Sequence, residues 1–260
     1  MSIELGELIV LVISFFLVAF LYSSVGFGGG SSYLALLALL ISSFFAIRST
    51  ALICNLVVVT GSCILFFKAG HLKFKTFLPF VLASIPMAFI GALFRLKEHI
   101  FFSILGIALI LAAISLVVQT LNLKTDVQSV KYPTWITYGV GGSVGLLSGL
   151  VGIGGGIFLA PILNYIKWGS PLRIAALTSF FILVNSISGI IGLFASGTFE
   201  VYWPELMLLI LAVFLGGQLG VRMALIKISP KRLRIFTAIL VFFVGFRVLI
   251  SNGLQLNILT

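Results

Sequence analysis

Charge is the scarcest property of this sequence. Only 8% of its 260 residues are Asp, Glu, Lys or Arg, whereas a soluble domain carries roughly 25%. With 61% hydrophobic residues, the chain could not cover the surface of a water-soluble globule. This excludes a soluble enzyme, a nucleic-acid-binding domain and a disordered chain. The apolar runs are continuous instead of alternating, which argues against a β-barrel. We therefore predict an all-α polytopic membrane protein whose surroundings are a lipid bilayer.

Acidic residues are especially few. The six carboxylates all lie at or near the ends of apolar segments, at Glu4, Glu7, Glu98, Asp126, Glu200 and Glu205. Proton-driven carriers commonly place a carboxylate or histidine inside the membrane, and a cationic substrate would also need an acidic counter-charge. The absence of buried acid therefore favours a small anion as the partner of this protein. We expect neither a metal nor another cofactor.

Cysteine and long polar stretches are also scarce. Cys54 and Cys63 share one apolar segment, and their nine-residue separation is about 13–14 Å along a helix, too far for a disulfide. The longest polar stretch, 122–134, is too short to fold as a catalytic domain. An intramembrane enzyme would need a catalytic set of His, Cys or carboxylate groups within the apolar segments, so we expect no enzyme. Residues 8–22 follow a start without Lys or Arg and are interpreted as a retained membrane helix.

Apolar segments fill most of the chain. A spanning helix needs about 20 mostly apolar residues, and we count about ten candidates, two of them short. They cover residues 5–24, 31–47, 49–67, 75–94, 100–120, 134–151, 156–167, 173–195, 203–226 and 233–251.

Two glycine clusters divide the chain into similar halves. Ser-Ser-Val-Gly-Phe-Gly-Gly-Gly at 23–30 corresponds to Ser-Gly-Leu-Val-Gly-Ile-Gly-Gly-Gly at 148–156, so that Gly26 matches Gly152 at an offset of 126. Each cluster precedes one of the two short segments. Glycine-broken segments at matching positions are typical of transporters built from repeats. We predict two inverted-topology repeats, residues 1–125 and 126–260.

The distribution of Lys and Arg tests this topology, because basic residues collect in cytoplasmic loops. If all ten segments cross and both termini lie outside, 12 basic residues lie inside: Lys68, Lys73, Lys75, Lys124, Lys131, Lys167, Arg173, Arg222, Lys227, Lys231, Arg232 and Arg234. Four lie outside, Arg48, Arg95, Lys97 and Arg247. An eight-span model, in which each glycine-broken pair crosses once, reduces the split to 10 against 6. Re-entrant hairpins keep the 12 to 4 split and remain open.

The glycine clusters are the first candidate site. A run of glycines breaks a helix, and broken backbone at membrane depth lines a cavity or is buried in protein. The next helix then begins with free N–H groups and a positive dipole end, which attract anions. The candidate substrate-binding residues of the two clusters are Ser23, Ser24, Gly28, Gly29, Gly30, Ser31, Ser32, Gly154, Gly155 and Gly156. Ser148 would add a further hydroxyl. The alternative is that the glycines serve only close helix packing.

Polar stripes mark the segments that follow. Arg48, Asn55 and Ser62 are spaced by seven, so they share a helical face. In the other half, Thr178, Asn185 and Ser188 also share one helical face. Asn55, Thr178, Asn185 and Gln218 are candidate substrate ligands, or they form hydrogen bonds between helices. Arg48 and Arg173 begin their segments and are candidates for attracting or gating an anion at either mouth.

The second cluster, Gly-Leu-Val-Gly-Ile-Gly-Gly-Gly-Ile-Phe-Leu-Ala-Pro at 149–161, resembles the TauE/SafE sulfite exporter family, also called the 4-toluene sulfonate uptake permease family. Ala-Leu-Thr-Ser at 176–179, which adds Ser179 to the candidate ligands, and Gly-His-Leu at 70–72 fit as well. The first cluster departs from the motif, with Ser-Ser-Tyr at 31–33.

The resemblance implies a transporter in the cell (inner or plasma) membrane that moves sulfite, a sulfonate or sulfoacetate, usually outward. An anion channel, or an uptake carrier for another small carboxylate or sulfonate, is the alternative. The sequence leaves open whether the chain acts alone or as a homodimer.

Overall fold

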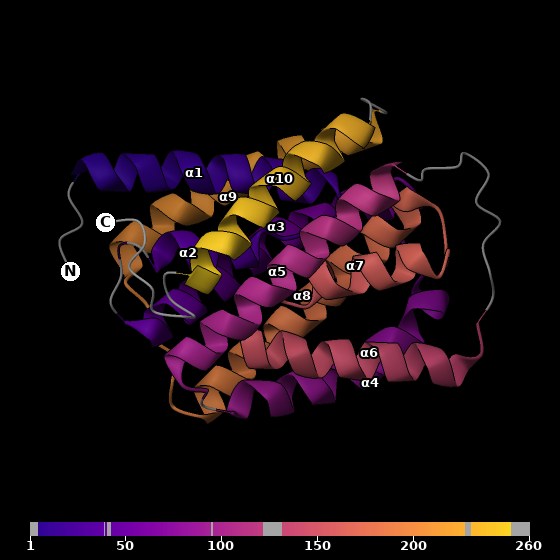
Figure 1. Cartoon of the computed structure of the whole chain (residues 1–260), viewed down its shortest axis with the longest axis horizontal. Coiled ribbons are helices and arrows are strands. Elements are labelled where there is room, and N and C mark those ends of the chain that lie inside the picture. Colours follow the sequence, from indigo (N-terminus) through magenta and orange to yellow (C-terminus); the bar gives the residue numbers. More distant parts are fainter. Residues whose placement is uncertain are drawn as a thin grey trace.

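The computed structural model describes residues 5–38, 40, 43–94, 96–121, 132–226 and 230–250, without the side chains of residues 119 and 230–234. Ten helices and no strand occur in these residues (Figure 1). The helices are α1 (Leu5–Ser24), α2 (Gly30–Leu37), α3 (Phe44–Lys68), α4 (Phe74–Leu93), α5 (Glu98–Leu121), α6 (Thr134–Val151), α7 (Gly156–Tyr165), α8 (Pro171–Ala195), α9 (Trp203–Leu225) and α10 (Pro230–Val248).

Six of the described helices, α1, α3, α4, α5, α8 and α9, are long and apolar enough to cross a membrane. Each has at least the roughly 20 residues that the hydrocarbon core requires. Many of their large apolar side chains face outward, for example Leu111 of α5 and Leu211 of α9. The predicted all-α polytopic membrane fold is confirmed.

Helices α2 and α7 are much shorter. They contain 8 and 10 residues, or about 12 and 15 Å of helix, roughly half the hydrocarbon thickness. Neither crosses a membrane by itself, so both match the re-entrant form of the predicted segments.

The predicted segment 31–47 has the wrong end. Residues 44–47 belong to α3, because the Ser43 side chain caps that helix by accepting a hydrogen bond from the Ala46 N–H (3.3 Å). An apolar stretch that continues through a cap cannot reveal the cap by hydrophobicity alone.

Glycines set the closest helix pairs. Gly216 and Gly220 of α9 lie against the backbone of Phe16 and Phe20 in α1, so the two helices run parallel (Figure 1). Helices α4 and α6 form the same kind of pair, with Gly141 on Phe80, Gly145 on Ser84 and Gly149 on Ala88. A side chain at these glycines would collide with the backbone of the partner helix.

The two central helices, α3 and α8, run antiparallel. The Asn55 Nδ2 donates to the Ser186 Oγ (3.2 Å), and Leu52 lies against Gly189. At one end, the Glu200 carboxylate, just after α8, accepts a hydrogen bond from the Ser43 hydroxyl (2.6 Å). Tyr202 donates to the same carboxylate (3.0 Å), and this hydrogen bond raises the pKa of the tyrosine.

Helix contacts come in matched pairs. The α1–α9 and α3–α9 contacts correspond to the α6–α4 and α8–α4 contacts, and α2–α3 corresponds to α7–α8. The antiparallel course of α3 and α8 favours the ten-segment arrangement, since an eight-span chain would make them parallel. This pattern supports the inverted repeats, which stay a prediction. The predicted boundary between residues 125 and 126 lies outside the described residues.

Basic helix ends gather on one side of the bundle. Trp168, between α7 and α8, contacts Phe77 at the start of α4 (6.0 Å between ring centroids), and the Arg173 guanidinium lies over the same indole (4.8 Å). Ile64, near the end of α3, lines one groove with Arg222 of α9. Of the predicted inside set, this side includes Lys68, Lys73, Lys75, Lys167, Arg173 and Arg222. Lys124, Lys131 and Lys227 and the side chains of Lys231, Arg232 and Arg234 lie outside the described part, as do Arg95 and both chain ends.

Candidate functional site

The first glycine cluster forms a break between α1 and α2. Gly26 and Gly29 have φ values of 86° and 92°, a left-handed conformation that only glycine adopts without strain. The Phe27 N–H donates to the Tyr22 carbonyl (2.8 Å) and closes the end of α1. Helix α2 then starts at Gly30, and its N-cap residue Gly29 makes no side-chain hydrogen bond to it.

The second cluster makes an equivalent break between α6 and α7. Gly152, Gly154 and Gly155 have φ values of 69°, 73° and 79°. Helix α7 starts at Gly156, also without a side-chain cap. An uncapped helix start leaves backbone N–H donors and the positive end of the helix dipole available to an anion.

Asn55 joins the two breaks. Its Oδ1 accepts a hydrogen bond from the Gly30 N–H (3.3 Å), and its Nδ2 donates to the Ile153 carbonyl (3.3 Å) as well as to Ser186. Asn55 is fully buried near the middle of α3, so both breaks meet inside the bundle. The predicted interhelical bonding of Asn55 is therefore observed, and it takes place between the predicted site elements.

Helix α8 presents one face to this junction. Ile182 and Ser186 lie against Gly154, while Thr178 and Ile182 lie against Gly156. The Ser179 hydroxyl donates to the Gly26 carbonyl (3.2 Å), which ties α8 to the first break. The Thr178 hydroxyl donates within its own helix, to the Ile174 carbonyl (2.7 Å).

The predicted serines of the first cluster are all buried, but their hydroxyls are directed differently. Ser23 donates to the Gly217 carbonyl of α9 (3.0 Å), and Ser24 to the Leu21 carbonyl (2.6 Å). Ser32 shares a hydrogen bond with the Tyr22 hydroxyl (2.6 Å). Ser31 is buried at the first turn of α2. Ser23 thus joins α1 to α9 and Ser24 bonds within α1, so both hydroxyls donate to carbonyls away from the start of α2.

We expect Arg48 at a mouth of the bundle from its sequence position. The structure instead buries it, with only 2% of its surface exposed. Its Nη2 donates to the carbonyls of Gly149 (2.8 Å) and Leu150 (3.3 Å), the last turn of α6. The last carbonyls of a helix receive no hydrogen bond from an N–H of the same helix, so a cation beside them stabilises the helix end. The arginine stands directly beside Gly152 of the second break.

Several buried polar atoms around this region have no hydrogen-bond partner among the residues described. They are the Tyr33 hydroxyl, the Arg48 Nε, the Ser148 hydroxyl, the Arg173 Nε and both amide atoms of Asn185. A native protein rarely leaves such atoms unpaired, and each one calls for an explanation.

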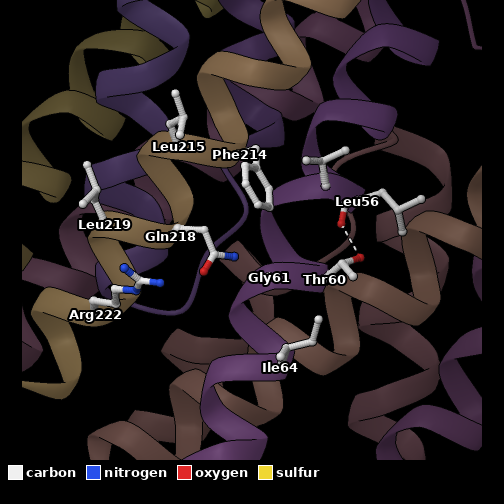
Figure 2. Close-up of a pocket in the computed structure, with 10 residues that line it drawn as sticks. Leu56, Thr60, Gly61, Ile64, Phe214, Leu215, Gln218, Leu219 and Arg222 are labelled. Carbon is white, nitrogen blue, oxygen red and sulfur yellow. Dashed lines mark hydrogen bonds between the residues drawn. The ribbon is translucent and has the colours of Figure 1, made fainter.

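Gln218 and Arg173 lie away from the breaks. Gln218 reaches across to Gly61 in an open groove between α3 and α9, with a volume near 640 Å³ (Figure 2). Arg222 lines the same groove, beside Leu219. The Arg173 guanidinium lies over Trp168 near the basic end of the bundle.

Sequence reasoning missed Ser186 and the placement of Ser148. The stripe that faces Asn55 runs through Ser179, Ile182 and Ser186, one residue away from the predicted Thr178 and Asn185 stripe. The seven-residue spacing of Ser179 and Ser186 was a visible signal. Which of two neighbouring stripes faces α3 depends on the rotation of α8, which glycine packing sets.

Amide N–H groups, hydroxyls and one guanidinium lie at the junction together with backbone carbonyls, and no carboxylate is among the described residues found there. Donors of these types are the ones that hold anions in proteins. Cys54 and Cys63 are buried free thiols outside this set.

Comparison with known proteins gives consistent matches over most of the chain. A family model described as sulfite exporter TauE/SafE matches residues 11–248. The chain is 32% identical over 249 residues to a probable membrane transporter protein of Sinorhizobium fredii, covering 94% of this chain and 98% of the relative. A probable membrane transporter protein of Methanocaldococcus jannaschii is 28% identical over 246 residues, 86% and 89% of the two chains. No solved structure matches.

Proposed function

Because the chain belongs to the TauE/SafE sulfite exporter family of integral membrane transporters, we propose that it carries a small sulfur-containing anion across the cell membrane. Sulfite, a sulfonate or sulfoacetate is the proposed type of substrate. Family membership makes the protein a transporter and not an enzyme.

The observation that carries this proposal is the junction of the two breaks. The two breaks meet at Asn55 in the middle of the bundle, and helix α7 starts there at Gly156 without a side-chain cap. Half-helix N-termini directed at a buried point are a recurrent way to hold anionic groups in transporters. Burying an anion without such donors would be prohibitively costly.

Burial of the junction favours a carrier over a channel. Asn55, Ser186 and Thr178 have essentially no exposed surface, so a solute reaches them only after surrounding helices move. Inverted repeats supply such a motion, because each half can adopt the conformation of the other and expose the site to the opposite side. We propose that the two halves of this chain work in this way.

Export needs no further energy source. An inside-negative potential of 100 mV drives each anionic charge outward with about 2.3 kcal/mol. We propose that both termini lie outside and that the basic helix ends, with Lys68 and Lys167, face the cytoplasm.

The test is flux from liposomes that contain the purified protein. Vesicles loaded with sulfite should release it in a saturable manner, and an inside-negative potassium diffusion potential should accelerate the release. External sulfoacetate, taurine, sulfate and lactate then show which anions compete. Protein-free vesicles are the control.

Two results would contradict the proposal. Unitary currents in a bilayer recording would show that the protein is an anion channel and not a carrier. Absence of flux for every anion tested, in vesicles where the protein is folded by circular dichroism and gel filtration, would show that the substrate class is wrong.

A further inference from the structure

The two breaks are equivalent in backbone but not in their surroundings. Gly26 of the first break lies against Ala175 of α8, whereas its counterpart Gly152 lies against Arg48 of α3. The position that packs on the first glycine is therefore an alanine in one half and an arginine in the other.

The same comparison extends to the neighbouring positions. Gly28 lies against Asn55 and Val59 of α3, and Gly154 lies against Ile182 and Ser186 of α8, which sets an offset of 127 between these helices. By this offset Asn185 matches Val58, and by the cluster offset of 126 Ser148 matches Tyr22. Arg48 and Ser148 thus lie at the second break and Asn185 on the neighbouring helix α8, where the equivalent residues of the other half are Ala175, Tyr22 and Val58.

The three polar residues of the second break are buried, with at most 2% of their surface exposed. Within the described chain the Arg48 Nε, the Ser148 hydroxyl and both Asn185 amide atoms lack a hydrogen-bond partner. Asn185 can accept a hydrogen bond through its Oδ1 and donate through its Nδ2. Leucine or alanine would fill these positions at lower cost, so a role in binding is a better explanation than packing.

Ser148 lies beside the start of α7. The Ser148 Oγ lies 3.2 Å from the point where a Cβ on Gly155 would stand, and Gly155 is the uncapped N-cap residue. Phe181 packs against the same point (2.9 Å). Asn185 follows Phe181 by one helical turn on the same face of α8.

The first break is filled by the protein itself. The Tyr22 hydroxyl is bonded to Ser32, and the Gly30 N–H is bonded to Asn55. The ring of Tyr33 covers Gly29, with its Cζ 2.7 Å from the position of a Cβ there. Arg173, two residues before Ala175 in the sequence, lies over Trp168 instead of at this break.

Given the proposed function, we propose that the second break alone holds the substrate and that the substrate binds as a singly charged oxyanion. Its charge faces the Arg48 guanidinium and the N-terminus of α7, and its oxygens accept hydrogen bonds from Ser148 and Asn185. One guanidinium offsets one charge, and a second buried charge without a partner is strongly unfavourable. A sulfonate with no second charged group, or bisulfite, fits this balance, whereas the sulfate and sulfoacetate dianions do not.

The test is a binding titration of the purified full chain with methanesulfonate and with sulfate. Ser148→Ala and Asn185→Leu should each raise the Kd for methanesulfonate by about tenfold or more, since a hydrogen bond to a charged group is lost. Without anion, both variants should melt at the wild-type temperature or above it, because an unpartnered buried polar group is removed. A purely structural role would lower the melting temperature instead.

The matched control is Tyr33→Phe, which removes the unpartnered hydroxyl beside the first break. Its Kd should stay within about twofold of the wild type. Equal weakening by Tyr33→Phe and Ser148→Ala would overturn the assignment to one break. Sulfate binding as tight as methanesulfonate would overturn the single charge. If the wild type binds no anion, the proposed function itself fails.

Discussion

Buried polar residues of the two central helices differ in whether their hydrogen-bonding groups are used within the protein. Asn55 uses both ends of its amide within the protein, so it is structural glue between the breaks. Asn185 uses neither end. Two buried asparagines on the two central helices, indistinguishable by composition, are therefore expected to respond in opposite ways to removal of their amides.

Asn55→Ala should lower the free energy of unfolding by about 2–5 kcal/mol, because it leaves the Gly30 N–H and the Ile153 carbonyl buried without partners. Thermal unfolding in detergent, followed by tryptophan fluorescence, measures this loss. The control is Thr60→Val on the same helix, where an exposed hydroxyl bonds only its own helix at Leu56. A change for Asn55→Ala no larger than for Thr60→Val would show that the amide does not hold the breaks together.

At the scale of helices, glycine seams decide which elements pair. The α4–α6 seam brings backbone against backbone through Gly141, Gly145 and Gly149. Close approach of this kind is the usual source of helix association in lipid, where apolar side chains gain little from burial. The seam also positions the end of α6, from which the second break begins.

Gly145→Ala should destabilise the protein by about 1–3 kcal/mol, since its Cβ would stand 2.6 Å from the Ser84 Cα and carbonyl oxygen. Gly142→Ala on the same helix should be neutral or stabilising by up to about 1 kcal/mol, because its nearest neighbours are 3.7 Å away. Chemical or thermal unfolding of the two variants side by side measures the difference. Equal stability would mean that the seam is not close-packed in the membrane.

For the whole molecule, the parallel or antiparallel direction of each helix pair indicates the membrane topology. Helices α1 and α9 run parallel, α4 and α6 run parallel, and α3 and α8 run antiparallel. Exchange of the two halves turns the first pair into the second and leaves α3–α8 unchanged, as inverted repeats require. The matching ends of α3 and α8, Lys68 and Ala195, should then face opposite sides of the membrane.

Lys68→Cys and Ala195→Cys test this expectation, because both positions are exposed and the native Cys54 and Cys63 are buried. A membrane-impermeant maleimide added to intact cells should label Ala195→Cys and leave Lys68→Cys unlabelled. Inside-out vesicles should give the reverse pattern. Labelling of both variants from one side would contradict the inverted topology.

The sequence by itself determined that the surroundings are a lipid bilayer, that the secondary structure is helical and where the two breaks lie. Continuous apolar runs permit only helices in lipid, because every backbone group must be paired within its own segment. A run such as Gly-Phe-Gly-Gly-Gly cannot continue a helix, so the positions of both breaks follow from local chemistry. The candidate site was therefore predictable as a pair of segments.

Only the tertiary structure decided what surrounds each break. The carbonyls that hold Arg48, the bridge of Asn55 to Ser186 and the unpartnered Asn185 depend on contacts between residues about 100 or more positions apart. Helical periodicity fixes which residues share a face but not how that helix is rotated in the bundle. For α8, close contacts of Gly26 with the Ala175 backbone and of its own Gly192 with α4 constrain that rotation. The surroundings that result make two breaks of nearly the same sequence chemically different.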